Sequence, residues 1–185
     1  MMKSAIYSVT VILCFIVQSC TKDTGKKTIL SIEDILIKNN EITGWSYSGT
    51  NWVANNRSDL TTYINGGADL YFKYGFIEAA YQKYSGSINN IGCEIQLYVY
   101  NLGSSVNTAN IFEDPDLGLS GAIVWTDNPA GTIAKYLRGN GLSQTMFFYR
   151  EKYLVNLAVT SDNQESLGIL KQFAKNIDEK LKLAL

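Results

Sequence analysis

The ten residues IGCEIQLYVY, at positions 91–100, alternate between apolar and more polar side chains. Successive side chains of a β-strand point to opposite faces, so Cys93 and Val99 share one face while Glu94 and Tyr100 share the other. The pattern predicts a half-buried strand of an antiparallel sheet. It also places Cys93 in the core, where apolar surroundings make a thiol inert.

Segments around this strand predict further strands of the same sheet. Residues 76–84 form a second strand, joined to the first through a turn of Gly, Ser and Asn. Gly139-Asn140-Gly141 is a hairpin signal within a longer β-meander. The four strands expected in that meander are 122–126, 132–138, 142–149 and 153–160.

The most distinct helix is expected at the C-terminus. Ser161 and Gln164 have the spacing of a capping box, which marks the first turn of a helix. An apolar stripe at helical spacing follows, made of Leu167, Leu170, Ala174, Ile177 and Leu181. An amphipathic helix buries such a stripe, so we expect it to pack on the sheet.

Earlier segments give weaker signals. Residues 58–74 predict a helix, because their apolar side chains recur at helical spacing. Residues 104–113 predict a short helix with Ser104 or Ser105 as its cap. Residues 29–43 predict a short helix or strand. Trp45 and Trp52 follow in a stretch rich in Ser, Asn and Gly, which is typical of a loop.

The order of these elements predicts one α+β domain at residues 29–185. Strands that follow one another without intervening helices favour an antiparallel sheet, with helices covering a face or an end. We expect about five to seven strands flanked by helices, with the C-terminal amphipathic helix on the sheet. The length of the segment suits a single domain.

The first 20 residues, MMKSAIYSVTVILCFIVQSC, predict an export signal. A single basic residue, Lys3, precedes an apolar run that is shorter than the roughly 20 residues of a membrane span. The run ends in Val17-Gln18-Ser19-Cys20, which resembles a lipobox. We therefore expect residues 1–19 to be removed and Cys20 to be lipidated; the alternative is an ordinary signal peptide with a chance Cys.

Residues 20–28 are expected to link the lipid to the domain. The sequence TKDTGKKT after Cys20 is too polar to bury apolar surface, so it predicts a flexible tether. The expected partner is thus the membrane, and the expected location is the bacterial cell envelope. Thr21 favours the outer membrane, and its periplasmic and surface faces are both left open.

Composition argues against several classes of function. The chain has no His, which removes the commonest general base and metal ligand. It carries 16 basic and 17 acidic residues, without the basic excess typical of nucleic-acid binding. After processing Cys93 would be alone, without a partner for an intramolecular disulfide. The sequence predicts no catalytic residue, no metal site and no cofactor.

Residues 63–71 read YINGGADLY and are followed by Tyr-Gly-Phe at 74–76. This segment resembles the "YINGGA(D/E)LY…YGF" motif of an uncharacterised bacterial family, a domain of unknown function in exported proteins and lipoproteins. Gly44-Trp45 and the sequence ANIF at 109–112 match outer features of that family. The resemblance covers most of residues 44–160. It implies a fold and export, and no known activity.

Gly66 and Gly67 interrupt a predicted helix, and each costs about 1 kcal/mol relative to Ala. We expect close packing of the helix on the sheet to offset this cost. The alternative is a ligand that approaches a bare helix face. Asn65 and Asp69 would then supply polar contacts, because residues four apart are neighbours on a helix.

Aromatic residues offer further candidate contacts. The chain has 12 Tyr, 7 Phe and 3 Trp, and aromatic surfaces suit sugars, peptides and protein partners. Trp45 and Tyr71 join Asn65 and Asp69 as candidate ligand-binding residues. We expect, however, that the tyrosine-rich face of the sheet is covered by the C-terminal helix.

Acidic residues give two weaker candidates. Glu78 and Glu94 lie on neighbouring predicted strands and are candidates for the paired carboxylates of a glycosidase. A second set has oxygen ligands suited to Ca²⁺. It consists of Asp114, Asp116, Asp127 and Asn128. We expect this second set to be solvated turn residues.

The leading hypothesis is a non-enzymatic binding or interaction module of the envelope, with an envelope protein or a glycan as its ligand. It predicts a cleft or an apolar patch beside residues 63–71. One alternative is an enzyme that acts on envelope glycan or peptide through carboxylates. Another is a structural subunit of an envelope complex.

Overall fold

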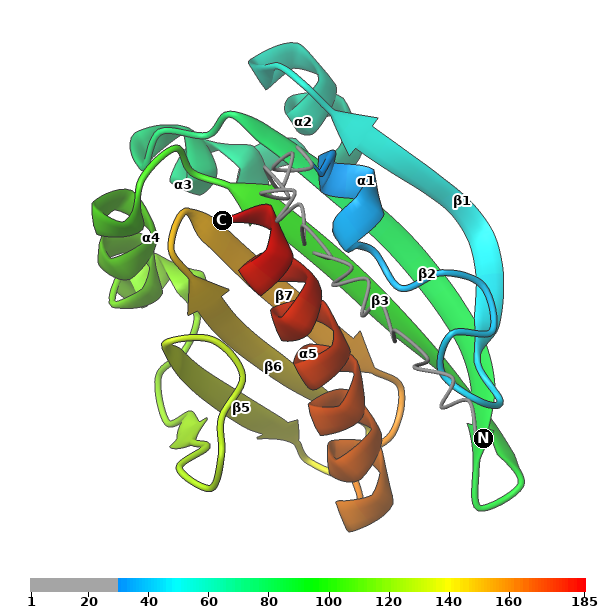
Figure 1. Cartoon of the computed structure of the whole chain (residues 1–185). Coiled ribbons are helices and arrows are strands. Elements are labelled where there is room, and N and C mark those ends of the chain that lie inside the picture. The colour runs from blue at the N-terminus through cyan, green and yellow to red at the C-terminus, as the bar shows by residue number, and fades with distance from the viewer. Residues whose placement is uncertain (1–29) are drawn as a thin grey trace, which may run out of the picture.

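A seven-stranded antiparallel sheet forms the centre of the computed structural model, which describes residues 30–185 (Figure 1). The predicted signal at 1–19, Cys20 and the tether at 20–28 lie outside the described residues. The strands are β1 (Ser46–Ala54), β2 (Glu78–Ile88), β3 (Ile91–Asn101), β4 (Ile123–Val124), β5 (Ile133–Gly139), β6 (Ser143–Arg150) and β7 (Tyr153–Val159). Their order in the sheet is β1-β2-β3-β7-β6-β5-β4. The prediction of a single α+β domain with an antiparallel sheet is confirmed.

Five α-helices accompany the sheet in this part of the chain. They are α1 (Ile32–Ile35), α2 (Arg57–Ile64), α3 (Ala68–Lys73), α4 (Ser105–Phe112) and α5 (Gln164–Ala184). There are also two short 3₁₀ turns: η1 (Asn65–Gly67) precedes α3, and η2 (Pro115–Leu117) follows α4. No helix within residues 30–185 combines the length and the apolar character that a membrane crossing needs.

Local turn chemistry explains the long β2–β3 hairpin. Asn89 and Asn90 have φ angles of 52° and 64°, and they connect Ile88 directly to its partner Ile91. A two-residue turn with both φ angles positive matches the twist of the strands, and Asn tolerates it better than most residues. The strand β7 then pairs with β3 on one side and with β6 on the other, which joins the hairpin to the meander.

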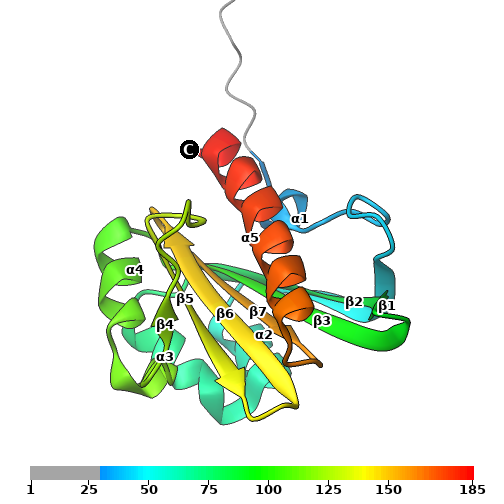
Figure 2. The ribbon, with the colours of Figure 1, turned by 90° about the horizontal axis from the view of Figure 1, so that it is seen from below.

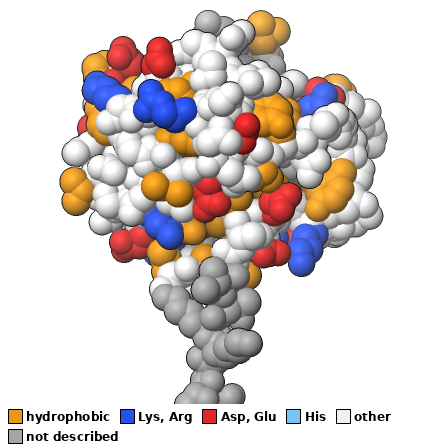
Figure 3. Space-filling view, turned by 90° about the horizontal axis from the view of Figure 1, so that it is seen from above, with side chains coloured by type: hydrophobic (Ala, Val, Ile, Leu, Met, Phe, Trp, Pro, Cys, Tyr) orange, Lys and Arg blue, Asp and Glu red, His pale blue; other side chains and the backbone are white. Residues whose placement is uncertain are grey.

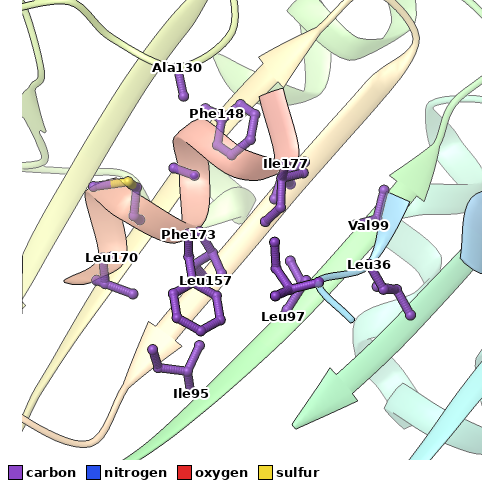
Figure 4. Packing of buried hydrophobic residues seen from close by; sticks show 14 of the residues in the cluster. Leu36, Ile95, Leu97, Val99, Ala130, Phe148, Leu157, Leu170, Phe173 and Ile177 are labelled. Atoms are coloured by element: carbon purple, nitrogen blue, oxygen red, sulfur yellow. The ribbon is translucent and has the colours of Figure 1, made fainter. Parts of the chain in front are cut away.

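Helix α5 covers one face of the sheet, as predicted, and forms the main core there. Phe173 is fully buried and points from α5 toward Ile95 and Leu157 on the strands below it (Figure 4). Cys93 belongs to the same cluster and is 5 % exposed, which confirms its expected place in the core. The helix buries the apolar faces of the central strands, and this burial is the largest favourable contribution to folding.

Helices α2, α3 and α4 lie on the opposite side of the sheet from α5 (Figure 2). A second core cluster forms there around Leu60, Tyr100, Phe112 and Leu154. This side carries Tyr98 and Tyr100 of β3 and Tyr149 of β6, while Tyr84 and Tyr153 lie beneath α5. The expectation that the C-terminal helix covers the tyrosine-rich face of β3 was therefore wrong. Side-chain alternation separates the two faces of a strand but does not say which face a distant helix covers.

Three local predictions also need correction. Trp52 lies in β1 and not in a loop; β1 was missed because a bulge between Ser48 and Trp52 interrupts its alternation. The helix expected at 58–74 is broken at Asn65 into α2 and α3. The cap of α5 is Asn163, whose side chain accepts from the backbone N–H of Ser166, and not Ser161. Asn fulfils this role as well as Ser.

Candidate functional site

The side of the sheet that α5 leaves free carries a contiguous set of six side chains, here called the groove floor. Side chains that pair directly across antiparallel strands point to the same face. One row runs from Gln96 on β3 through Ala158 on β7 to Thr145 on β6. The next row, in the same strand order, consists of Tyr98, Asn156 and Phe147.

The segment that includes η1 and α3 lies beside this floor and forms a wall. Together they border an open hollow of about 380 Å³, and the wall contributes Ile64, Gly67, Leu70 and Tyr71. Asp116 and Leu117 of η2 close another side. A second hollow of about 400 Å³ shares Gly67, Leu70 and Asp116 with the first. We call the two adjoining hollows the groove.

The wall has its shape because the helix expected across residues 58–74 stops at Ile64. Asn65 has φ 55° and ψ −137°, a backbone conformation that residues other than Gly rarely adopt. Residues 65–67 continue as a 3₁₀ turn, and α3 begins at Ala68. This break turns the backbone of Gly66 and Gly67 toward the second hollow, which both residues line.

Neither glycine is required by packing. A Cβ atom placed on Gly66 or on Gly67 would meet no described atom within 4 Å, outside the local backbone. Neither residue has a positive φ, so backbone conformation does not demand glycine either. The expectation that close packing offsets their cost is therefore wrong. The structure instead places two bare backbone units at the surface of the groove.

Aromatic rings line the cavity and continue beyond it. Tyr71 and Tyr100 stack with their ring centroids 4.0 Å apart, and burial raises the pKa of both phenols. Tyr98 is half-buried, and burial raises its pKa as well. From Tyr98 a strip of stacked or tilted rings runs outward through Tyr81 and Trp52 to Tyr63. Tyrosine and tryptophan rings of this kind act as apolar surfaces with a hydrogen-bonding tip.

The polar groups of the floor are neutral amides and hydroxyls. The hydroxyl of Tyr98 donates to Oε1 of Gln96 at 3.3 Å. Oδ1 of Asn156 is buried and has no hydrogen-bond partner among the described residues. An unsatisfied buried acceptor costs roughly 1–3 kcal/mol.

Charge gathers at the rim of the groove. Asp69, Lys73 and Asp116 line the second hollow, and Nζ of Lys73 lies 2.7 Å from Oδ2 of Asp114. Hydrogen bonds from Lys73, the Tyr74 hydroxyl and the Asp116 N–H lower the pKa of Asp114 to about 2. The ammonium group is thus engaged, and the rim presents carboxylates to an incoming molecule. Elsewhere, acidic and basic side chains are interspersed on the face drawn in Figure 3.

The structure brings only part of the predicted ligand-binding set together. Asp69 and Tyr71 line the groove. Asn65 forms the turn before η1 and lines neither hollow. The prediction of Trp45 as a ligand-binding residue was wrong. Its side chain is 3 % exposed and packs edge-to-face on Phe173, in the core beneath α5.

Sequence reasoning missed most of the floor. Gln96 and Tyr98 lie on the same face of β3 as Glu94 and Tyr100, which the alternation of residues 91–100 separated from the face of Cys93. The sequence did not predict the floor residues Asn156, Thr145 and Phe147. They lie beside Gln96 and Tyr98 only because β7 pairs with both β3 and β6. The cleft expected beside residues 63–71 is present.

The carboxylate pair proposed for glycosidase chemistry does not form. Glu78 pairs with Asn101 of β3, seven residues along the strand from Glu94, a separation of roughly 23 Å. Strand alternation also places the two carboxylates on opposite faces of the sheet. Their side chains are engaged elsewhere, with Asn101 donating to Glu78 and Lys83 lying 3.0 Å from Glu94.

The candidate Ca²⁺ ligands are also dispersed. Asp114 is paired with Lys73, and Asn128 accepts a hydrogen bond from Lys175 of α5. Within residues 30–185 there is no cluster of three or more His, Cys, Asp or Glu residues suited to a metal ion.

Comparisons with known proteins give a likeness of fold. No protein-family model matches the chain, and a sequence search of curated proteins finds no match. The chain is similar in structure to the extracellular domain of PknH from Mycobacterium tuberculosis, with a TM-score of 0.54 and 13% sequence identity. The match covers 84% of this chain and 98% of that domain. At this identity the likeness concerns the fold alone.

Proposed function

We propose that this protein is a non-enzymatic binding module of the bacterial cell envelope. The observation that carries the proposal is the groove, in which bare glycine backbone faces a floor of aromatic rings and neutral amides. Gly66 and Gly67 have no packing or conformational reason among the described residues. A ligand that approaches the backbone closely would supply one.

The chemistry of the groove supports binding rather than catalysis. General acid–base catalysis needs a group whose pKa lies near the working pH. The chain has no His, and the pKa values of the groove phenols Tyr71, Tyr98 and Tyr100 are shifted further above neutrality. A concave site in which aromatic rings stand beside a few convergent polar groups is typical of a small-molecule binding site.

Gly67 allows a direct test of the groove. Gly67→Leu places an isobutyl group in open space between the two hollows and should block ligands. Gly92→Leu is the matched control, because Gly92 also has no described atom near its Cβ, has no positive φ and lies outside the groove.

The probes are neutral oligosaccharides, neutral peptides and palmitate, titrated calorimetrically into the full chain. We expect at least one probe class to bind the wild type and the Gly92→Leu variant and to lose at least tenfold in affinity with Gly67→Leu. No binding by any class, or equal binding by both variants, would contradict a ligand-binding groove.

We further propose that lipid on Cys20 holds the module at the membrane. The lipobox-like sequence at 17–20 supports this, as does a fold similar to a domain described as extracellular. Cys20→Ser should abolish labelling by radioactive palmitate and move the protein from the membrane fraction to the soluble fraction. Unchanged labelling of the variant would refute the anchor and leave the groove proposal intact.

A further inference from the structure

The groove floor has a depression at Ala158. Ala158 is the smallest side chain of the floor and is flanked directly by Gln96 and Thr145 on the neighbouring strands. Neighbouring strands lie about 4.8 Å apart, so the backbones of Gln96 and Thr145 are roughly 10 Å apart. Asn156 follows two residues away on the same face of β7, roughly 7 Å along the strand. The depression has the breadth of one pyranose ring with its hydroxyl groups.

The groups around this depression match a hydroxyl-rich ligand. An amide side chain offers both donors and acceptors, and the Thr hydroxyl offers both as well. Each sugar hydroxyl is likewise a donor and an acceptor, so adjacent hydroxyls fit Gln96, Asn156 and Thr145.

The aromatic rings beside the depression suit the other side of such a ligand. Tyr98 and Phe147 flank Asn156 in the next row of the floor. A pyranose ring has an apolar face of C–H groups and an equatorial edge of hydroxyls. The aromatic rings of one row can contact the apolar face of the sugar while the amides of the floor contact its hydroxyl groups.

Other ligand classes fit less well. An acyl chain would cover the amides of Gln96 and Asn156 without offering partners, which is costly. An anion would meet the carboxylates of Asp69 and Asp116, while Lys73 is engaged by Asp114. A peptide strand could not extend the sheet here, because β3, β7 and β6 lie inside it and use their backbone groups in pairing.

We propose that the groove binds a neutral oligosaccharide, with one pyranose ring seated over Ala158 and the chain continuing past Gly67 into the second hollow. This rests on the proposed binding function and names its ligand class. The two hollows share Gly67 and Leu70, so a chain of more than one sugar unit can occupy both. Carboxylates at the far end accept hydrogen bonds from hydroxyls of a further unit.

The test uses a blocking variant, a polar deletion and a matched control. Ala158→Phe fills the depression from a half-exposed position and leaves the polar groups in place. Gln96→Ala removes one amide. Ser85→Phe is the control, because Ser85 is also half-exposed on the free face of an internal strand but lines neither hollow. Equal thermal unfolding temperatures for the variants establish that the fold is retained.

The probes are neutral tetrasaccharides of glucose, mannose and N-acetylglucosamine, an oligogalacturonate tetramer, a neutral Pro/Ala peptide and palmitate. They are titrated into the full chain in a detergent without a sugar headgroup. We expect a neutral tetrasaccharide to bind the wild type and the control equally, at least tenfold more weakly to Ala158→Phe, and about fivefold more weakly to Gln96→Ala.

The outcomes separate the two proposals. Binding of the peptide or of palmitate alone, sensitive to Ala158→Phe, would overturn the saccharide inference and leave the binding function standing. Binding of the oligogalacturonate in preference to every neutral sugar would overturn the inference that the ligand is uncharged. Saccharide binding that Ala158→Phe leaves unchanged would overturn the assigned site. No binding by any probe would overturn both proposals.

Discussion

At Gly66 and Gly67 the chain accepts a conformational cost that the described fold does not require. Glycine loses more backbone freedom on folding than any other residue. Neither position has a positive φ or a close neighbour, while Asn65 beside them adopts a positive φ of 55°. A stretch that breaks local preference without a compensating contact is typical of a functional site.

Replacing these glycines should therefore stabilise the protein. Gly67→Ala should raise the free energy of unfolding by about 0.5–1 kcal/mol, because alanine restricts the unfolded chain and fits the folded one. Urea denaturation followed by circular dichroism measures the change. The contrasting variant is Gly86→Ala, whose Cβ would lie 2.5 Å from the Trp45 ring and should destabilise. A loss of stability in Gly67→Ala would mean that packing does require this glycine.

At the scale of elements, α5 is joined to the sheet by an ion pair as well as by its apolar stripe. Asp178 is 1 % exposed at its side chain and accepts hydrogen bonds from Nε and Nη2 of Arg150, at 2.5 and 2.9 Å. Arg150 ends β6, so the pair fixes the rotation of α5 relative to that strand. The same helix face carries Phe173 and Ile177 onto the core.

Removing one partner of this pair should be costly. Asp178→Ala should lower the free energy of unfolding by about 3 kcal/mol, because it leaves the guanidinium group of Arg150 partly buried and unpaired. Glu179→Ala is the control on the next residue, where the side chain is 65% exposed. We expect that variant to stay within about 0.5 kcal/mol of the wild type in guanidinium denaturation. Equal effects of the two substitutions would contradict a structural role for the pair.

At the scale of the whole molecule, two aspartates connect segments that are distant in sequence. Asp114 binds Lys73 and Tyr74 of the α3 region, and Asp162 binds Arg138 of β5. The hydrogen bond from Arg138, with those from the Gly141 N–H and Gln144, lowers the pKa of Asp162 to about 2. Asp114 has a pKa of about 2 for the corresponding reason, its bonds to Lys73 and Tyr74.

These two groups should make the fold sensitive to acid. Their pKa values are lower in the folded state than the value of about 3.9 in an unfolded chain, so protons bind first to the unfolded state. The stability that they contribute is present above about pH 4 and is lost as the pH falls to about 2. Urea denaturation between pH 5 and pH 2 should show a steeper decline for the wild type than for Asp114→Asn/Asp162→Asn. Equal slopes would show that other groups dominate acid unfolding.

Local periodicity in the sequence determined much of the fold. It predicted the strands at 76–84 and 91–100, the buried Cys93 and the amphipathic C-terminal helix, because neighbouring residues impose the 2.0 and 3.6 residue repeats. The tertiary structure decided which face α5 covers, that Trp45 is buried and that the helix breaks at Asn65. It alone placed Gln96 next to residues of β7 and β6, about 60 and 50 residues later in the chain. Such neighbours depend on strand register and on the global burial of side chains, which local periodicity does not encode.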